Sequence, residues 1–140
     1  MALAIESFRE LRVWQASMDL VEQIYRVTGG FPRHELYGLA SQMQRAAVSV
    51  PSNIAEGHTR EHRAEYLHHI SIAQASLAEL QTQLEISVRL GYLTPEAARQ
   101  PLVDMASLAK QLYSLRNALT RPRGRRPPTP NPQHPTPVTE

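Results

Sequence analysis

Histidines and carboxylates that could bind a metal gather in the middle of the chain. His58 and His62 are four residues apart, and His62, Glu65 and His69 can share one face of a helix. Glu65-x-x-His68 has the spacing of the di-iron sites of helical bundles, which need two such motifs and two further glutamates. Glu65 is the only acid with a histidine three residues later. We therefore expect a polar surface here and no metal cofactor; a metal-dependent enzyme using Glu65 and His68 is the alternative.

Other catalytic arrangements are missing from the sequence. No Gly-x-Ser-x-Gly motif presents a serine nucleophile. The only lysine, Lys110, follows no glycine-rich loop, which argues against a phosphate-binding nucleotide site. The chain has no cysteine, which excludes disulfides and thiolate chemistry. We expect no enzymatic activity, no cofactor and no small-molecule substrate.

A polar stripe runs through residues 45–57, RAAVSVPSNIAEG, around Pro51. Its members recur at steps of four, three and four: Arg45, Ser49, Ser52 and Glu56. Three interpretations are open. The stripe is a solvated face, a partly buried network in which Arg45 pairs with Glu56 or with the backbone that Pro51 leaves unpaired, or a subunit or ligand contact. The alanines that flank the stripe allow helices to approach closely, which favours packing.

Positive charge is concentrated at the C-terminus. The formal net charge is +2, and residues 121–140 carry four arginines and one acid, or +3, which leaves −1 for residues 1–120. The arginines are Arg121, Arg123, Arg125 and Arg126. Guanidinium groups on a flexible segment can contact phosphates, each contact adding about 0.9 to the salt slope. We expect weak, sequence-independent association with nucleic acid at most.

Amphipathic helices are expected to position these groups, and the first, residues 7–28, is apolar on two sides. One line contains Leu11, Trp14, Met18, Val21 and Tyr25, and the other contains Val13, Leu20, Ile24 and Val27. Such a helix needs two partners: the rest of its own bundle and another subunit. Trp14 is expected in the core, and Gly29 and Gly30 end the helix.

The second expected helix begins near His34 or Glu35 and ends at Gly57. Proline inside a helix removes one hydrogen bond and bends or breaks the helix. The helix either bends at Pro51 and continues to Glu56, or stops and restarts with Asn53 as its cap. We favour the continuous helix because Ile54 prolongs the apolar side.

Two further helices complete the bundle. The third is expected from a cap at Thr59 to Leu90, ending at Gly91, with an apolar seam of Tyr66, Ile70, Ala73, Leu77, Leu80 and Leu84. Thr94-Pro95-Glu96 opens the fourth, whose seam is Met105, Leu108, Leu112, Leu115 and Leu119. Short turns predict an all-α, antiparallel up-down-up-down four-helix bundle over residues 1–120.

The remaining twenty residues, 121–140, contain seven prolines and almost nothing apolar, which predicts a disordered Pro/Arg-rich tail. No apolar run approaches the roughly 18 residues of a membrane span, and the first residues lack the pattern of a secretory signal. We therefore expect no contact with a membrane and a cytoplasmic protein.

Several motifs resemble one family of small bacterial proteins. They are Phe8-x-x-Leu11-x-Val13-Trp14-Gln15, Phe31-Pro32, Glu35-Leu36-Tyr37-Gly38-Leu39, the segment 45–57 and Gly91-Tyr92-Leu93. Over roughly residues 6–118 the sequence resembles the four-helix bundle proteins encoded in intervening sequences of bacterial 23S ribosomal RNA genes. It is similar, more distantly, to the accessory bundle protein of diversity-generating retroelements.

The resemblance implies an antiparallel four-helix bundle that assembles as a homopentamer and has no assigned enzymatic activity. It marks the residues Arg45, Ser49, Pro51, Asn53, Glu56 and Gly57 as an architectural motif. The retroelement relatives bind a reverse transcriptase and nucleic acid through a positively charged ring. Our leading hypothesis is a non-enzymatic oligomeric scaffold that touches RNA, and an accessory protein of a reverse transcriptase is an alternative.

Overall fold

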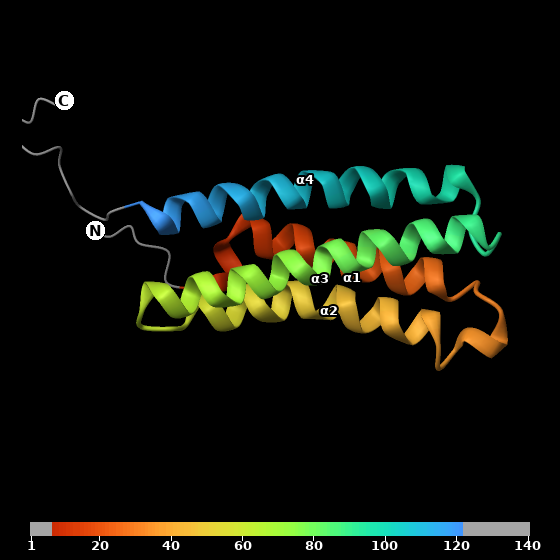
Figure 1. Ribbon diagram of the computed structural model, residues 1–140, viewed down its shortest axis with the longest axis horizontal. Coiled ribbons are helices and arrows are strands. Elements are labelled where there is room, and N and C mark those ends of the chain that lie inside the picture. Colours follow the sequence, from red (N-terminus) through yellow and green to blue (C-terminus); the bar gives the residue numbers. More distant parts are fainter. Residues whose placement is uncertain (1–6, 122–140) are drawn as a thin grey trace, which may run out of the picture.

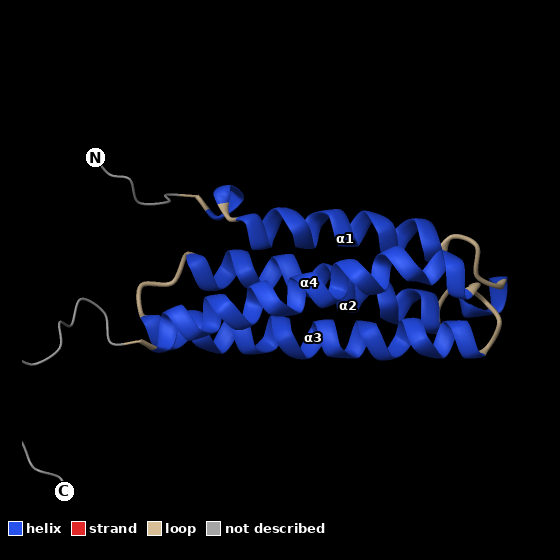
Figure 2. Ribbon diagram, turned by 90° about the horizontal axis from the view of Figure 1, so that it is seen from above, coloured by secondary structure: helices blue, strands red, loops and turns tan. Residues whose placement is uncertain are grey.

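Four long α-helices form the part of the chain that the computed structural model describes, residues 7–121 (Figure 1). They are α1 (Arg12–Thr28), α2 (Leu39–His58), α3 (Arg63–Arg89) and α4 (Pro95–Thr120), with short 3-10 helices η1 (Phe8–Glu10) and η2 (Arg33–Glu35). Residues 7–121 contain no strand. Consecutive helices pack against each other and α4 returns to α1, as Figures 1 and 2 show. The predicted up-down-up-down bundle is confirmed.

The seams predicted for the third and fourth helices fill the core. Ile70, Ala73, Leu77, Leu80 and Leu84 of α3 are all buried, as are Met105, Leu108 and Leu112 of α4. Leu115 and Leu119 are partly buried against the same core. A spacing of three and four residues keeps these side chains on one side of each helix, so burying them excludes water along the bundle.

The first helix starts later than predicted. Ser7 Oγ accepts a hydrogen bond from Arg9 N at 3.1 Å and caps η1, and Leu11 then adopts an extended conformation. The predicted start at Ser7 is wrong because its hydroxyl caps a separate 3-10 turn. Phe8 packs edge-on against Trp14, with ring centroids 5.3 Å apart.

The two apolar lines of α1 have different surroundings. The line with Val13, Leu20 and Ile24 is buried in the core. In the other line, Leu11, Trp14 and Val21 are partly buried against the core, whereas Met18 and Tyr25 are exposed. Trp14 nevertheless packs against the core cluster, so the expectation that it contributes to core packing is confirmed, although its side chain is not fully buried.

The second helix also begins later than predicted, at Leu39 rather than His34 or Glu35. The chain forms η2 and a turn first, and the Glu35 carboxylate then accepts a hydrogen bond from Leu39 N at 2.9 Å. A carboxylate at this point satisfies one of the free N–H groups at the helix start. Glu35 thus caps α2 from outside it.

Helix α2 is continuous through Pro51 and extends to His58, so the alternative of a break and restart is wrong. Asn53 does not cap a new helix, because its Nδ2 donates to Ser49 O at 2.9 Å, one turn back in the same helix. Thr59, predicted to cap the third helix, instead ends the second and donates from Oγ1 to Glu56 O at 2.8 Å. Helix α3 begins only at Arg63.

The turn between α3 and α4 follows the prediction. Gly91 has a φ of +80°, a left-handed conformation that glycine adopts without strain. Thr94 Oγ1 then accepts a hydrogen bond from Ala97 N at 3.1 Å and caps α4.

Within residues 7–121, none of the helices combines the length and apolar character that crossing a membrane requires.

Gly57 allows α2 and α3 to approach closely, and its replacement tests this contact. A Cβ at position 57 would lie 2.9 Å from His69 Cβ and 2.9 Å from Tyr66 Cδ1. We expect Gly57→Ala to lower the free energy of unfolding by about 1–3 kcal/mol, measured by urea denaturation, because the two helices must separate. Gly30→Ala is the matched control, since its Cβ meets only Val27 O at 3.9 Å. Equal stability of the two variants would contradict the close contact.

Candidate functional site

Polar side chains of the segment 45–57 join α2 to α3. Ser49 Oγ lies 2.8 Å from Ser76 Oγ of α3. Asn53 Nδ2 donates to Ser49 O and, at 3.1 Å, to Ser49 Oγ. Asn53 Oδ1 lies 2.9 Å from His69 Nδ1, so the histidine nitrogen is the donor. The network therefore connects one turn of α2 with two positions on α3.

Glu56 lies at the edge of this network. Its Oε1 is 3.6 Å from His69 Nδ1, and its side chain is largely exposed. The hydrogen bond with Asn53 orients the imidazole, and the carboxylate adds an attraction when the imidazole is protonated. His69 is thus held by two residues of the segment 45–57.

The polar stripe divides between these roles. Ser49 belongs to the network and Glu56 borders it, whereas Arg45 and Ser52 are exposed. In residues 7–121, the ion-pair partner of Glu56 is His69 and not Arg45. The predicted pairing of Arg45 with Glu56 is therefore wrong. The residue that completes the network, His69, came from outside the stripe and was missed.

A second polar cluster closes the opposite end of the bundle. Tyr92 Oη donates to Glu35 Oε2 at 2.8 Å, while Leu39 N donates to the other carboxylate oxygen. The hydrogen bonds from Leu39 and Tyr92 hold the pKa of Glu35 below its ordinary value. The same bond from Tyr92 to Glu35 raises the pKa of the Tyr92 hydroxyl. Two segments marked by the resemblance, 35–39 and 91–93, therefore meet in one hydrogen-bonded cluster.

The candidate metal residues do not form a complete site. Glu65 and His68 are exposed on α3 and border a hollow of about 350 Å³ with Arg60 and His69. Over the described range, no group of three or more histidines and carboxylates is arranged to hold a metal ion. The second Glu-x-x-His motif that a di-iron site requires is missing from the sequence.

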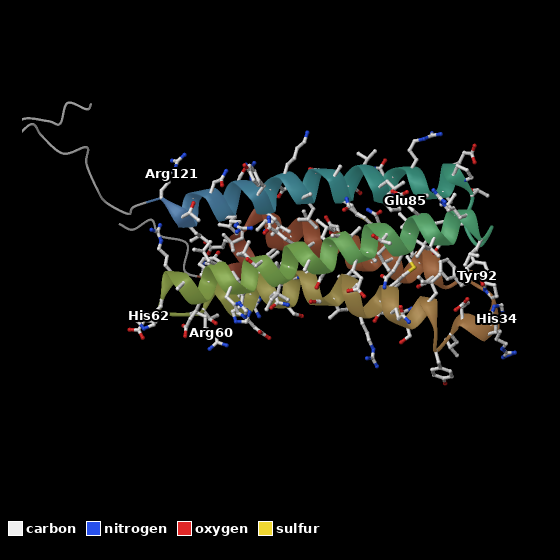
Figure 3. All side chains as sticks on the ribbon, viewed as in Figure 1. His34, Arg60, His62, Glu85, Tyr92 and Arg121 are labelled. Atoms are coloured by element: carbon white, nitrogen blue, oxygen red, sulfur yellow. The ribbon has the colours of Figure 1, made fainter. Side chains whose placement is uncertain are left out.

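The arginines of the tail are described only at their first member. Arg121 is exposed at the end of α4, and its carbonyl accepts a hydrogen bond from Arg63 Nη1 at 2.8 Å. Figure 3 shows Arg121 and His62 at one end of the bundle and Tyr92 and His34 at the other. Arg123, Arg125 and Arg126 lie outside the described residues.

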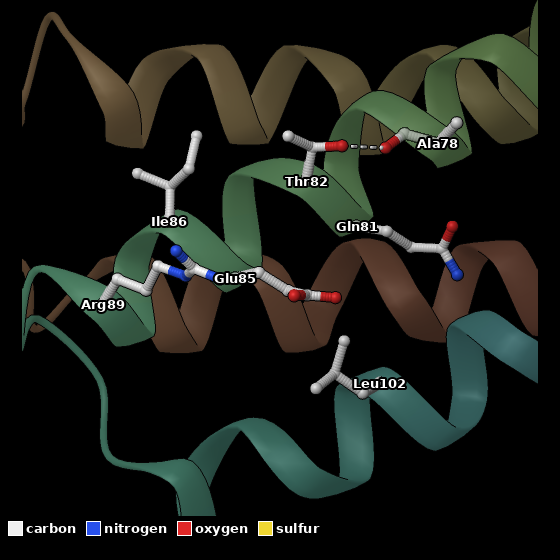
Figure 4. Close-up of a pocket in the computed structure, with 7 residues that line it drawn as sticks. All are labelled: Ala78, Gln81, Thr82, Glu85, Ile86, Arg89 and Leu102. Atoms are coloured by element: carbon white, nitrogen blue, oxygen red, sulfur yellow. Dashed lines mark hydrogen bonds between the residues drawn. The ribbon is translucent and has the colours of Figure 1, made fainter.

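Another surface hollow, of about 570 Å³, lies between α3 and α4 (Figure 4). Glu85 and Arg89 of α3 line it with Leu102 of α4. Thr82 Oγ1 donates to Ala78 O at 2.9 Å, so this hydroxyl is engaged within its own helix. The residues that line this hollow do not bring together a nucleophile and a base.

These features define a class of protein, a small antiparallel four-helix bundle in which polar clusters join the helices. A family model described as "23S rRNA-intervening sequence protein" matches residues 9–114, so the chain belongs to this family. A solved structure with the same fold is a protein of unknown function from the S23 ribosomal protein family of Bacteroides thetaiotaomicron. It has a TM-score of 0.67 and 23% identity, and the match covers 74% of this chain and 97% of that chain. No curated protein matches the chain.

The Glu35 cluster predicts a pH-dependent stability. Because folding lowers the pKa of Glu35 below 4.5, its contribution is present above about pH 4.5 and is lost as the pH falls through the folded-state pKa. We expect Glu35→Gln to be less stable than the parent at pH 7 and the difference to narrow below pH 4.5, measured by urea denaturation. Glu22→Gln is the control, since Glu22 is exposed and lies 3.9 Å from Arg26. If the difference in free energy of unfolding between the parent and Glu35→Gln stays constant with pH, the role assigned to the Glu35 carboxylate is contradicted.

Proposed function

We propose that this protein is a non-enzymatic cytoplasmic scaffold that assembles into a homopentamer and associates weakly with RNA. The observation that carries the proposal is the second apolar line of α1, which its own bundle leaves partly exposed. The number of five subunits comes from the family resemblance.

Three exposed apolar side chains lie on α1 and the neighbouring α2. Met18 and Tyr25 are 40% and 49% exposed, and Val48 of α2 is 40% exposed. Gln44 Nε2 of α2 donates to Thr28 Oγ1 of α1 at 3.0 Å, so a side-chain hydrogen bond joins the two helices. We name Met18, Tyr25 and Val48 the α1–α2 apolar face. Burying large apolar side chains against a second copy would remove them from water, which stabilises an oligomer.

The polar clusters support a structural role over an enzymatic one. The side chains of His69 and Glu35 are 14% and 19% exposed, and both are hydrogen-bonded to neighbouring helices or turns. A general base needs access to a substrate proton at hydrogen-bond distance. These groups already have intramolecular partners.

Weak RNA association is the second part of the proposal. Arg121, Arg123, Arg125 and Arg126 follow α4 with no acid before Glu140. Guanidinium groups bind phosphate oxygens, and such contacts act on any sequence. Titration of labelled RNA with the full chain at low salt tests this part, and absence of binding would contradict it.

Charged substitutions on the α1–α2 apolar face test the assembly. By sedimentation we expect a species about five times the 15.8 kDa mass of the chain. Met18→Glu and Tyr25→Glu should shift it toward the monomer, because a carboxylate at a subunit contact loses its hydration. Val103→Glu is the matched control, since Val103 is an exposed apolar residue of α4.

Two results would contradict the assembly. One is a monomeric parent protein at micromolar concentration. The other is an assembly of unchanged size in both Met18→Glu and Tyr25→Glu, with helical content verified by circular dichroism.

A further inference from the structure

The second half of α4 carries positive charge and no acid. Residues 105–139 contain no aspartate or glutamate, although they include six cations: Lys110, Arg116, Arg121, Arg123, Arg125 and Arg126. Two of these cations, Lys110 and Arg116, lie within α4. The net charge of residues 1–120 conceals this local excess, because the acids of that range all precede position 105.

One face of α4 presents two of these cations, Lys110 and Arg121, to solvent. Lys110, Tyr113, Asn117 and Arg121 recur at steps of three, four and four, and all are exposed. Tyr113 is 61% exposed, whereas Leu108 and Leu112 of the same helix are buried in the core. An outward aromatic ring therefore stands between two cations. We name these four residues the α4 cationic face.

The neighbouring helices extend this positive surface. A hollow of about 630 Å³ between α1 and α4 is lined by Arg12, Lys110, Gln111 and Ser114, together with Val13 and Ala16, and has no acid. On the other side, Arg116 Nη1 donates to Gln74 Oε1 of α3 at 3.2 Å. Glu10, two residues before Arg12, and Glu79, five residues after Gln74, are the nearest acids in sequence, and neither lines the hollow.

Arg63 adds a further cation where α4 ends. Its guanidinium donates to the carbonyls of Arg121 at 2.8 Å and Ala118 at 3.3 Å. These bonds neutralise none of its charge, because both acceptors are backbone carbonyls. They also place Arg63 beside Arg121, at the C-terminal end of α4.

We propose that the α4 cationic face binds single-stranded RNA, with the cations on phosphates and Tyr113 stacked on an unpaired base. This inference rests on the RNA association proposed above and adds a binding surface on the bundle itself. Duplex bases are stacked on one another, so an exposed tyrosine ring finds a base only in a single strand. A helix that binds a membrane surface presents a wide apolar side, whereas this face has one aromatic ring among polar groups.

The test measures anisotropy of a labelled single-stranded RNA with the full chain across salt concentrations. Lys110→Ala should lower the salt slope by about 0.7, the value for one phosphate contact on a single strand. Tyr113→Ala should weaken binding about fivefold or more with an unchanged slope, because a stacked base is lost and no charge is removed. Tyr113→Phe should bind like the parent.

Matched substitutions elsewhere on the bundle serve as controls. Arg26→Ala removes an exposed cation of α1, and Tyr37→Ala removes an exposed tyrosine of the turn before α2. Both should bind RNA like the parent protein. Replacing Arg123, Arg125 and Arg126 with alanine in the full chain should weaken binding and leave the effect of Tyr113→Ala in place.

The outcomes separate this inference from the proposed function. Absence of RNA binding by the full chain at 50 mM salt would contradict the RNA association itself. Parent-like binding by both Lys110→Ala and Tyr113→Ala, with binding lost in the triple arginine variant, would overturn only the α4 surface. Equal or tighter binding of the annealed duplex would also overturn it. Tighter binding to phosphatidylcholine–phosphatidylserine vesicles than to RNA would assign the surface to a membrane.

Discussion

The close approach of α2 and α3 is the constraint on which the rest of the bundle depends. Gly57 leaves no room for a side chain between α2 and α3. Eight residues earlier in α2, the hydroxyl of Ser49 contacts that of Ser76 and joins the same two helices. Asn53 and His69 must then meet, because a polar group left without a partner in a partly buried contact is destabilising. These contacts fix how far α2 and α3 are shifted along each other, and α3 in turn positions α4.

The polar residues of the two clusters join helices and turns within the bundle. Asn53 and His69 join α2 to α3, and Glu35 and Tyr92 join the turn before α2 to the turn after α3. The α1–α2 apolar face and the α4 cationic face are formed by different helices. In the proposed function, an oligomer formed through the first would leave the second open to RNA.

Helical periodicity was enough to predict the fold, because seams such as that of α3 depend only on residue type and spacing. The cap at Thr94 and the turn at Gly91 were also predicted, since each depends on the local backbone. The starts of α1, α2 and α3 were not predicted, because their capping groups have other partners: Ser7 caps a separate 3-10 turn, Glu35 bonds to Leu39 four residues later, and Thr59 bonds back to Glu56 of α2. Contacts between distant residues, such as Asn53 with His69, leave no periodic trace in a single sequence.

The central claim is that the segment 45–57 serves to lock α2 to α3. A double-mutant cycle with Asn53→Ala and His69→Ala, followed by urea denaturation, tests it most directly. Residues in one hydrogen-bonded network have coupling energies of about 0.5–3 kcal/mol, and we expect a value in that range for this pair. Free energies that add within about 0.3 kcal/mol would show that the two side chains act independently and would contradict the account.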